Sequence, residues 1–217
     1  MRVSIIGGGG WGLALAKLLA ENSRQVMVWE HDPLFLKSLL QSHSNPALLP
    51  DVLLPPGIRF TGSFSELSDF APQLVILATP SQFLRATLRG IPSQLKETLW
   101  NTDAVKAVVN VAKGIETDSL CTMSEVLQAE LPAALHSRIC VLSGPSHAEE
   151  VARRIPTTVV IAGHDDLLLQ ALQNVFSNAY FRVYRSSDLI GVEIGGAVKN
   201  VISLAAGIIA GLGFGDN

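Results

Sequence analysis

A cluster of glycines follows a short apolar run at the start of this sequence. Gly7-Gly8-Gly9-Gly10-Trp11-Gly12 comes directly after Val3-Ser4-Ile5-Ile6 and opens a helical pattern. Gly7, Gly9 and Gly12 fill the pattern G-x-G-x-x-G, which permits a tight turn, close approach of a pyrophosphate and close packing of helix on strand. The helix N-terminus then offers free N–H groups to phosphates. We therefore predict a Rossmann-type site for NAD(H) or NADP(H), in preference to a glycine-rich turn without a ligand.

The second apolar run ends in an acid and an imidazole. Glu30 lies eighteen residues after Gly12, near the position where an acidic residue binds the ribose 2′-hydroxyl of NAD. The alternative is a surface charge at the end of a strand. His31 could instead contact the 2′-phosphate of NADP when it is protonated. The pair leaves the choice between NAD and NADP open.

Short apolar runs alternate with helical patterns along most of the chain. The runs are rich in Val, Ile and Leu without strict alternation, which is typical of strands covered by helices on both faces. We expect strands at 3–6, 25–29, 74–78, 105–111, 139–142 and 158–162. We expect helices at 11–22, 34–42, 82–89, 123–131 and 167–176. This alternation predicts an α/β fold with a doubly wound, mainly parallel Rossmann-type sheet.

The character of the sequence changes at Asp188. Residues 189–209 carry few charges and many small side chains, which predicts a buried helix of a different, all-helical domain. We therefore divide the chain into a dinucleotide-binding domain at 1–187 and the first helix of an incomplete C-terminal substrate domain at 188–217. We expect such a chain to be catalytically weak, and to self-associate, for instance as a homodimer, through the apolar face of its last helix.

Composition narrows the class of protein further. The chain is 48% hydrophobic and 16% charged with a formal net charge of −3, which argues against disorder and against nucleic-acid binding. Cys121 and Cys140 lack metal-binding spacing, so we expect free thiols in a reducing cytoplasm and no metal site. We expect no signal peptide, because four glycines interrupt the N-terminal apolar segment, and no membrane insertion, because the uncharged stretch 201–215 is short.

Six short motifs follow one another in a fixed order. They are Gly9-Gly10-Trp11-Gly12; Asn45-Pro46 with Leu49-Pro50 and Leu54-Pro55; Ala112-Lys113-Gly114; Ser143-Gly144-Pro145-Ser146 with Ala148-Glu149-Glu150; Gly196-Ala197-Val198-Lys199-Asn200; and Gly213-Phe214-Gly215-Asp216-Asn217. Through these motifs the chain resembles the NAD(P)-dependent glycerol-3-phosphate dehydrogenases along essentially all of its length. One departure is Gly10, where that family more often has serine or alanine.

The resemblance implies an activity and a set of site residues. The family reduces dihydroxyacetone phosphate to sn-glycerol 3-phosphate, a precursor of glycerophospholipids. By resemblance, the cofactor would contact Gly10, Trp11, His31 and Ala148, which adds to Gly7, Gly9, Gly12 and Glu30 from the glycine pattern. Substrate would contact Lys113, Gly144, Ser146 and Lys199. Lys113 would also touch the cofactor, and Lys199 would be the proton donor and acceptor.

The two lysines suit the reduction of a ketone. The cofactor carries the hydride, and the protein must orient it and manage the proton. Lys199 lies in an apolar helix, where desolvation or a neighbouring cation would lower its pKa; the alternative is a lysine that extends to solvent. Lys113 ends a strand, at the edge where doubly wound sheets bind ligands, and would polarise the carbonyl. A strand-end lysine without a function is the alternative there.

Three further polar positions lie at turns. Ser146 precedes a helix and could cap it, and capping alone would explain it without a substrate. We rank His147 below the lysines as an acid or base, because a turn histidine is more often a surface residue. Asp165-Asp166 also precedes a helix and is expected to cap it rather than to bind a metal.

Two other functions compete with the dehydrogenase. One is a 3-hydroxyacid or ketopantoate-type reductase of the same two-domain plan, against which the segment 144–148 and Lys199-Asn200 argue. The other is a protein that binds a dinucleotide without turnover.

Overall fold

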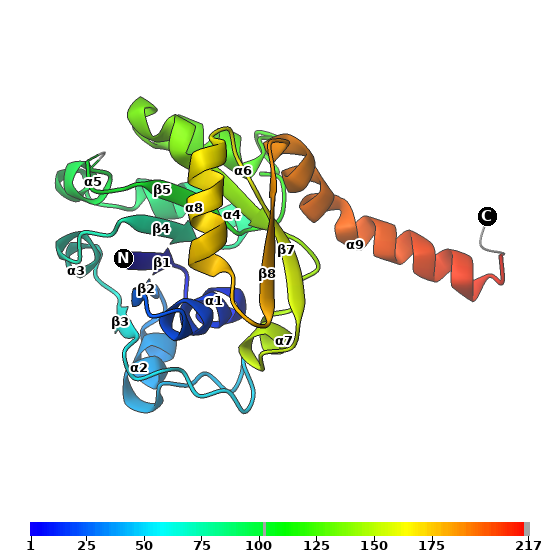
Figure 1. Cartoon of the computed structure of the whole chain (residues 1–217), viewed down its shortest axis with the longest axis horizontal. Coiled ribbons are helices and arrows are strands. Elements are labelled where there is room, and N and C mark those ends of the chain that lie inside the picture. Colours follow the sequence, from blue (N-terminus) through cyan, green and yellow to red (C-terminus); the bar gives the residue numbers. More distant parts are fainter. Residues whose placement is uncertain (102, 215–217) are drawn as a thin grey trace.

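The computed structural model of this chain describes residues 1–101 and 103–214, and its centre is one eight-stranded sheet (Figure 1). The spatial order is β3-β2-β1-β4-β5-β6-β7-β8. All neighbours are parallel except β6 and β7, which are antiparallel. The strands are β1 (Arg2–Ile6), β2 (Gln25–Trp29), β3 (Arg59–Thr61), β4 (Leu74–Leu77), β5 (Ala107–Asn110), β6 (Ile139–Ser143), β7 (Thr157–Ala162) and β8 (Phe181–Ser186). The predicted doubly wound, mainly parallel sheet is confirmed.

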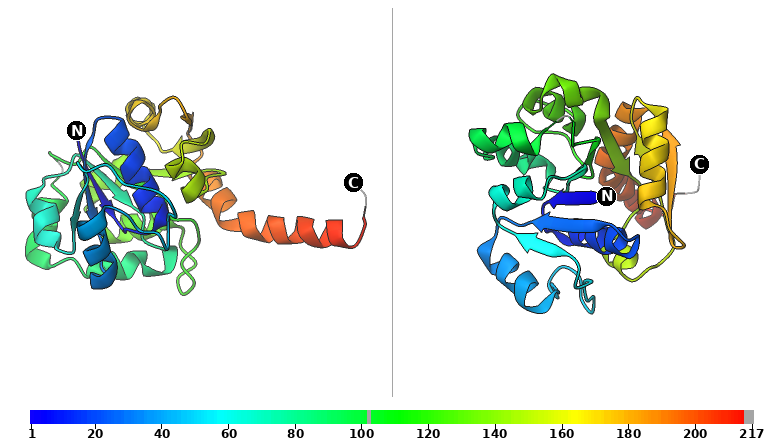
Figure 2. Two further views of the ribbon diagram at one scale, coloured as in Figure 1. Left: turned by 90° about the horizontal axis from the view of Figure 1, so that it is seen from below. Right: turned by 60° about the vertical axis from the view of Figure 1, so that its left-hand side comes forward.

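Helices cover both faces of the sheet (Figure 2). One apolar core packs α1 (Gly10–Glu21), α2 (Pro33–Ser42), α7 (Ala148–Ala152) and α8 (Asp166–Phe176) against the strands. The opposite core packs α3 (Phe64–Asp69), α4 (Ser81–Arg89), α5 (Ser93–Leu99), α6 (Met123–Glu130) and the 3-10 turn η1 (Ala133–Arg138). Burial of the strands on both faces explains their continuous apolar runs.

The strand and helix predictions hold for the elements with strong patterns. Each of the six expected strands and five expected helices coincides with an observed element. Two strands were not predicted: β3, which is three residues long, and β8, which alternates between buried and exposed positions. The short helices α3, α5 and α7 were not predicted either, because their lengths of five to seven residues give little periodicity.

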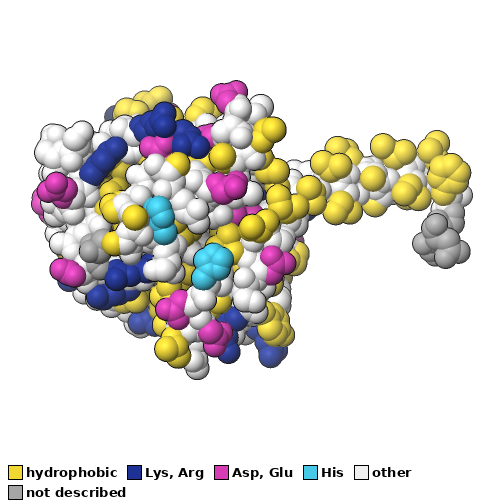
Figure 3. Space-filling view, turned by 90° about the horizontal axis from the view of Figure 1, so that it is seen from above, with side chains coloured by type: hydrophobic (Ala, Val, Ile, Leu, Met, Phe, Trp, Pro, Cys, Tyr) yellow, Lys and Arg dark blue, Asp and Glu magenta, His cyan; other side chains and the backbone are white. Residues whose placement is uncertain are grey.

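The last helix, α9 (Leu189–Gly211), departs from the sequence prediction. The helix itself is present, but the expectation that it is buried is wrong: Leu189 and Glu193 are its buried residues. Its contacts with the sheet are made to β6 and β7, and every described residue from Lys199 onward is exposed. Figure 3 shows hydrophobic side chains along the helix as it projects from the sheet domain. An apolar pattern predicts burial only where another element packs against it.

By length and composition, α9 is also apolar enough to cross a bilayer, as core helices of globular proteins can be. At 23 residues, α9 is longer than the uncharged stretch 201–215, whose short length was the reason to expect no membrane insertion. Residue 102 and residues 215–217, which end the last sequence motif, lie outside the described part of the chain.

Candidate functional site

The phosphate loop joins β1 to α1, and its glycines have distinct roles. Gly7 has a φ of +117°, and a Cβ there would lie 2.8 Å from the Ala78 carbonyl carbon. A Cβ on Gly12 would collide with the Gly7 carbonyl. A Cβ on Gly9 would meet no atom within 4 Å, so the loop opens onto free space at that residue. Gly7 and Gly12 are thus fixed by packing, whereas Gly9 is free to face a ligand.

The N-terminus of α1 is left open toward that space. Gly9 is the N-cap residue, and no side chain caps the helix. The first N–H groups of a helix have no intrahelical acceptor, and together they attract anions. A Cβ on Gly10 would lie 3.4 Å from the Leu48 oxygen and 3.7 Å from the Ala148 Cβ, which places those two residues around the loop. These features fit the pyrophosphate of a dinucleotide.

A groove of about 510 Å³ extends from this loop to the end of β2. Glu30 and His31 line it together with apolar side chains that include Phe35 and Phe83. Glu30 is buried, and its carboxylate accepts hydrogen bonds from the N–H groups of Gly8 (3.0 Å) and Asp32 (2.8 Å). The Nδ1 atom of exposed His31 lies 2.9 Å from the Glu30 Oε1 atom. The sequence-predicted pair therefore lies at the end of the groove, beside the phosphate loop.

A second cavity, of about 390 Å³, continues from the loop in the other direction. It is lined by Gly10, Trp11, Lys113, Ser146 and Ala148, with other residues. Both cavities include Gly9 and the segment 78–80, so they form one continuous surface along the carboxyl ends of the parallel strands. Doubly wound sheets bind their ligands at this edge.

Lys113 is held in the second cavity by the turn after β6. Its Nζ donates to the Gly144 carbonyl at 2.9 Å and lies 3.4 Å from the Ser146 Oγ. Burial lowers the pKa of the Lys113 amine below its ordinary value, and the nearby Lys199 ammonium lowers that pKa further. The structure therefore brings three predicted substrate residues together and places the fourth within electrostatic range.

Lys199 lies on α9 and lines a third cavity of about 550 Å³. Ser143, Gly144 and Gly196 line the same cavity, as does Ser203. Gly196, Lys199 and Ser203 thus share one face of α9. Lys199 itself is exposed, unlike the desolvated lysine expected from its apolar neighbours, because α9 leaves the sheet domain at this point.

The expected cap on the helix after β6 is wrong. The N-cap residue of α7 is His147, and no side chain caps this helix. Ser146 instead has its Oγ 3.4 Å from the Lys113 Nζ, and its N–H donates to the Gly144 carbonyl, the group to which Lys113 also donates. His147 is exposed. The capping prediction for α8 is confirmed, since Asp165 accepts from the N–H groups of Leu167 and Leu168.

Several residues of the site escaped the sequence analysis. Thr79 and Pro80 follow β4 and line both of the first two cavities. The Thr79 hydroxyl donates to the Ile6 carbonyl at 3.2 Å, which ties β4 to the end of β1. Their position directly after a predicted strand was the available signal, because such strands end at the ligand edge. Leu48 lies in a long loop that carries no comparable signal.

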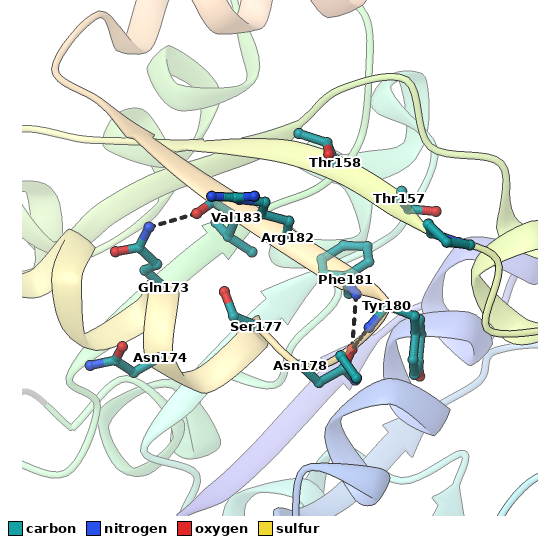
Figure 4. Close-up of a pocket in the computed structure, with 12 residues that line it drawn as sticks. Thr157, Thr158, Gln173, Asn174, Ser177, Asn178, Tyr180, Phe181, Arg182 and Val183 are labelled. Atoms are coloured by element: carbon teal, nitrogen blue, oxygen red, sulfur yellow. Dashed lines mark hydrogen bonds between the residues drawn. The ribbon is translucent and has the colours of Figure 1, made fainter.

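Another groove, of about 590 Å³, lies apart from these residues between α8, β7 and β8 (Figure 4). Two of its polar side chains bond to their own surroundings: the Gln173 amide donates to the Val183 carbonyl, and the Asn178 side chain accepts from the Phe181 N–H. None of the predicted site residues lines this groove.

The sheet order, the open helix terminus and the glycine loop together define a Rossmann-type dinucleotide-binding fold. Residues 2–168 match the model of the NAD-dependent glycerol-3-phosphate dehydrogenase N-terminus, and residues 188–217 match that of the C-terminus of the same enzymes. The chain belongs to the NAD-dependent glycerol-3-phosphate dehydrogenase family.

Individual relatives agree with this assignment. Over the whole chain, identity is 44% to a glycerol-3-phosphate dehydrogenase [NAD(P)+] of Fusobacterium nucleatum and 46% to one of Nocardia farcinica. The chain spans 62% and 63% of their lengths, respectively. Solved glycerol-3-phosphate dehydrogenases from Plasmodium falciparum and Coxiella burnetii superpose on all of it with TM-scores of 0.85 and 0.81, at 26% and 27% identity. The chain covers 61% and 63% of those structures.

Proposed function

We propose that this chain binds NAD(H) or NADP(H) and contributes to the interconversion of dihydroxyacetone phosphate and sn-glycerol 3-phosphate. The observation that carries the proposal is the placement of Lys113. Its ammonium lies on the Gly144 carbonyl beside Ser146, at the end of the dinucleotide groove and within range of Lys199. Two cations at one end of such a groove suit a small phosphorylated ketone.

The residues around the phosphate loop fit the cofactor. Gly9 leaves open space in front of the uncapped N-terminus of α1, where a pyrophosphate would lie. Glu30 and His31 would face the ribose that carries the adenine, and Trp11 and Ala148 would line the path toward Lys113. When bound, the cofactor supplies the hydride that reduces the substrate carbonyl carbon.

The two lysines would divide the remaining work. Lys113 would donate a hydrogen bond to the carbonyl oxygen and so stabilise negative charge as it develops there. The Lys199 ammonium would give a proton to that oxygen in the reduction and take it back in the oxidation. Ser146 would orient both Lys113 and the substrate through its hydroxyl. The lowered pKa of Lys113 is consistent with a partly desolvated site that has room for one more anionic group.

Substrate selectivity tests this proposal. NADH oxidation by the purified chain is expected to be weak, but dihydroxyacetone phosphate should support it and 2-dehydropantoate, the substrate expected of the competing reductase, should not. As a readout without turnover, amines can be labelled with acetic anhydride and quantified by mass spectrometry. Dihydroxyacetone phosphate with NADH should protect Lys113 from labelling, whereas exposed Lys37 should react as before. Protection by 2-dehydropantoate alone would favour the other reductase, and protection by neither would leave only dinucleotide binding.

We also propose the assignments that accompany this function. Residues 1–187 would form the dinucleotide-binding domain, and residues 188–217 would belong to a C-terminal substrate domain. A role in glycerophospholipid synthesis in the cytoplasm, and a homodimer formed through α9, complete the proposal. Support for the domain division comes from the C-terminal family model, whose match begins at residue 188.

A further inference from the structure

The exposed helix α9 is fastened to the sheet domain by a buried carboxylate. Glu193 is 7% exposed and accepts two hydrogen bonds from Ser124, one from its N–H at 2.8 Å and one from its hydroxyl at 2.5 Å. Ser124 is 3% exposed and belongs to the first turn of α6. The carboxylate therefore docks on the positive end of α6, where a negative charge is stabilised. Hydrogen bonds that involve a charged group are also stronger than neutral ones.

The first two turns of α9, from Leu189 to Gly196, pack on the sheet beside the proposed site. Leu189 and Val192 pack on Val141 and Ala162 of the sheet. A Cβ on Gly196 would lie 2.6 Å from the Ser143 Oγ and 3.5 Å from the Lys113 Cγ, so the helix passes directly over the Lys113 side chain. From Lys199 onward every described residue of the helix is exposed. The residues from Leu189 to Gly196 therefore set the direction in which the rest of α9 leaves the domain.

We infer that Glu193 is a positioning residue, which through its two bonds to Ser124 fixes α9 so that Lys199 stands opposite Lys113. The inference rests on the proposed function, in which Lys113 and Lys199 both act on the carbonyl oxygen of one substrate. Lys199 lies six residues after Glu193, or about 9 Å further along the helix axis. A helix held at so few points transmits any tilt at Glu193 to Lys199. No contact of Glu193 with either lysine is required.

The pKa of Lys113 provides a readout that separates positioning from a direct charge effect. If the anchor is lost and α9 moves away, Lys113 loses the nearby Lys199 cation and gains solvent, and both changes raise its pKa toward the ordinary value. Removal of the Glu193 charge alone would act in the opposite direction, because loss of a carboxylate lowers the pKa of a nearby amine. The two explanations therefore predict opposite signs.

The experiment measures the rate at which acetic anhydride labels Lys113 at pH 8 in the full chain. Only the neutral amine reacts, so a raised pKa slows the labelling. Each rate is divided by the rate at high pH, where the amine is neutral in every variant, so that a change in the exposure of Lys113 does not alter the result. For Glu193→Ala we expect labelling about three- to fivefold slower than in the unchanged chain, the scale of a lost charge–charge interaction near a protein surface. Ser124→Ala, which keeps the backbone N–H, should slow labelling less. Glu193→Gln should keep the unchanged rate or exceed it, because an amide can bond to both groups of Ser124.

Glu97→Ala is the matched control, since Glu97 is exposed on α5 and carries the same charge. Circular dichroism and NADH affinity identify variants that fold, and the Glu193→Ala affinity should equal that of the unchanged chain. Should Glu193→Ala fail to fold, Ser124→Ala decides the question. Labelling of Lys113 at or above the unchanged rate in folded Glu193→Ala, or in folded Ser124→Ala if Glu193→Ala does not fold, would overturn the positioning role. The proposed function fails by a different observation, the absence of protection by dihydroxyacetone phosphate in the unchanged chain.

Discussion

The Glu30 carboxylate accepts a hydrogen bond of 3.0 Å from the Gly8 N–H, which joins the end of β2 to the phosphate loop after β1. A Cβ on Gly8 would lie 2.5 Å from the same carboxylate oxygen, so the loop approaches Glu30 as closely as a glycine permits. Glu30 thus braces the loop and also faces the groove. A substitution of Glu30 that changes cofactor preference therefore also weakens the support of the phosphate loop.

That double role shapes the prediction for cofactor choice. Glu30→Ser should shift preference from NAD(H) toward NADP(H), because it removes a negative charge that would repel a 2′-phosphate. Glu30→Gln should shift the ratio in the same direction while it keeps an acceptor for the Gly8 N–H. Fluorescence titrations with NADH and NADPH give both affinities. An unchanged ratio in both variants would show that Glu30 does not face the ribose.

A substitution at Gly9 should impair ligand binding without impairing folding. Gly9→Val should leave the fold intact, since a Cβ there meets no atom within 4 Å, and should weaken NADH binding severely by blocking the pyrophosphate. Gly57→Val is the control, because Gly57 is exposed and equally unobstructed but lies away from the loop. Thermal unfolding and NADH titration of both variants check the prediction. A folded Gly9→Val chain with unchanged affinity would exclude the loop as the pyrophosphate site.

Lys199 is predicted to be the acid and base. In an enzyme that joins this chain to a complete C-terminal domain of the family, Lys199→Met should lower the rate of NADH oxidation with dihydroxyacetone phosphate by about 10²- to 10⁴-fold, the usual contribution of general acid–base catalysis. NADH affinity should stay nearly the same, because Lys199 lines the third cavity rather than the dinucleotide groove. Steady-state and titration measurements on one preparation test both parts. A loss below about tenfold would transfer the role to Lys113, with His147 next.

An ion-pair cluster near the ligand edge makes stability depend on pH. Arg85 donates to Glu116 from α4, and this bond lowers the pKa of Glu116 to about 2. Because the folded-state pKa is depressed, the contribution of the carboxylate is present above its unfolded value and is lost as pH falls toward 2. Glu116→Gln should therefore lower the Tm at pH 7 and have little effect near pH 2. Equal Tm differences at both pH values would contradict this assignment.

The exposed apolar face of α9 predicts self-association. Ile202, Leu204 and Ile209 are 63%, 69% and 47% exposed, respectively. Exposed patches of this kind mark association sites. Light scattering coupled to size exclusion should show a mass that rises with concentration, and the double variant Ile202→Glu with Ile209→Glu should reduce it. Lys37→Glu, on the surface of α2, controls for the changed net charge, because it also makes the chain more negative by two charges. A chain that stays monomeric at all concentrations would show that α9 does not pair with itself.

The sequence by itself determined the elements whose signals are local. The glycine loop, the buried parallel strands and the acid at the end of β2 follow from spacing and from apolar runs, which record how a strand is covered. Lys113 could be placed at the ligand edge for the same reason, since every parallel strand ends there. The burial of α9 could not be predicted, because an apolar helix looks the same in sequence whether or not another element packs on it.

Only the tertiary structure decided which side chains meet. The position of Ser146 before a helix predicts a helix cap. In the structure its hydroxyl instead lies beside Lys113, 33 residues earlier in the chain. Glu193 carries no motif, and its importance appears only when α9 crosses the first turn of α6, 69 residues away. Such contacts depend on how the elements cross in space. Local propensity and periodicity contain no information on that crossing, because they describe each segment against its immediate neighbours alone.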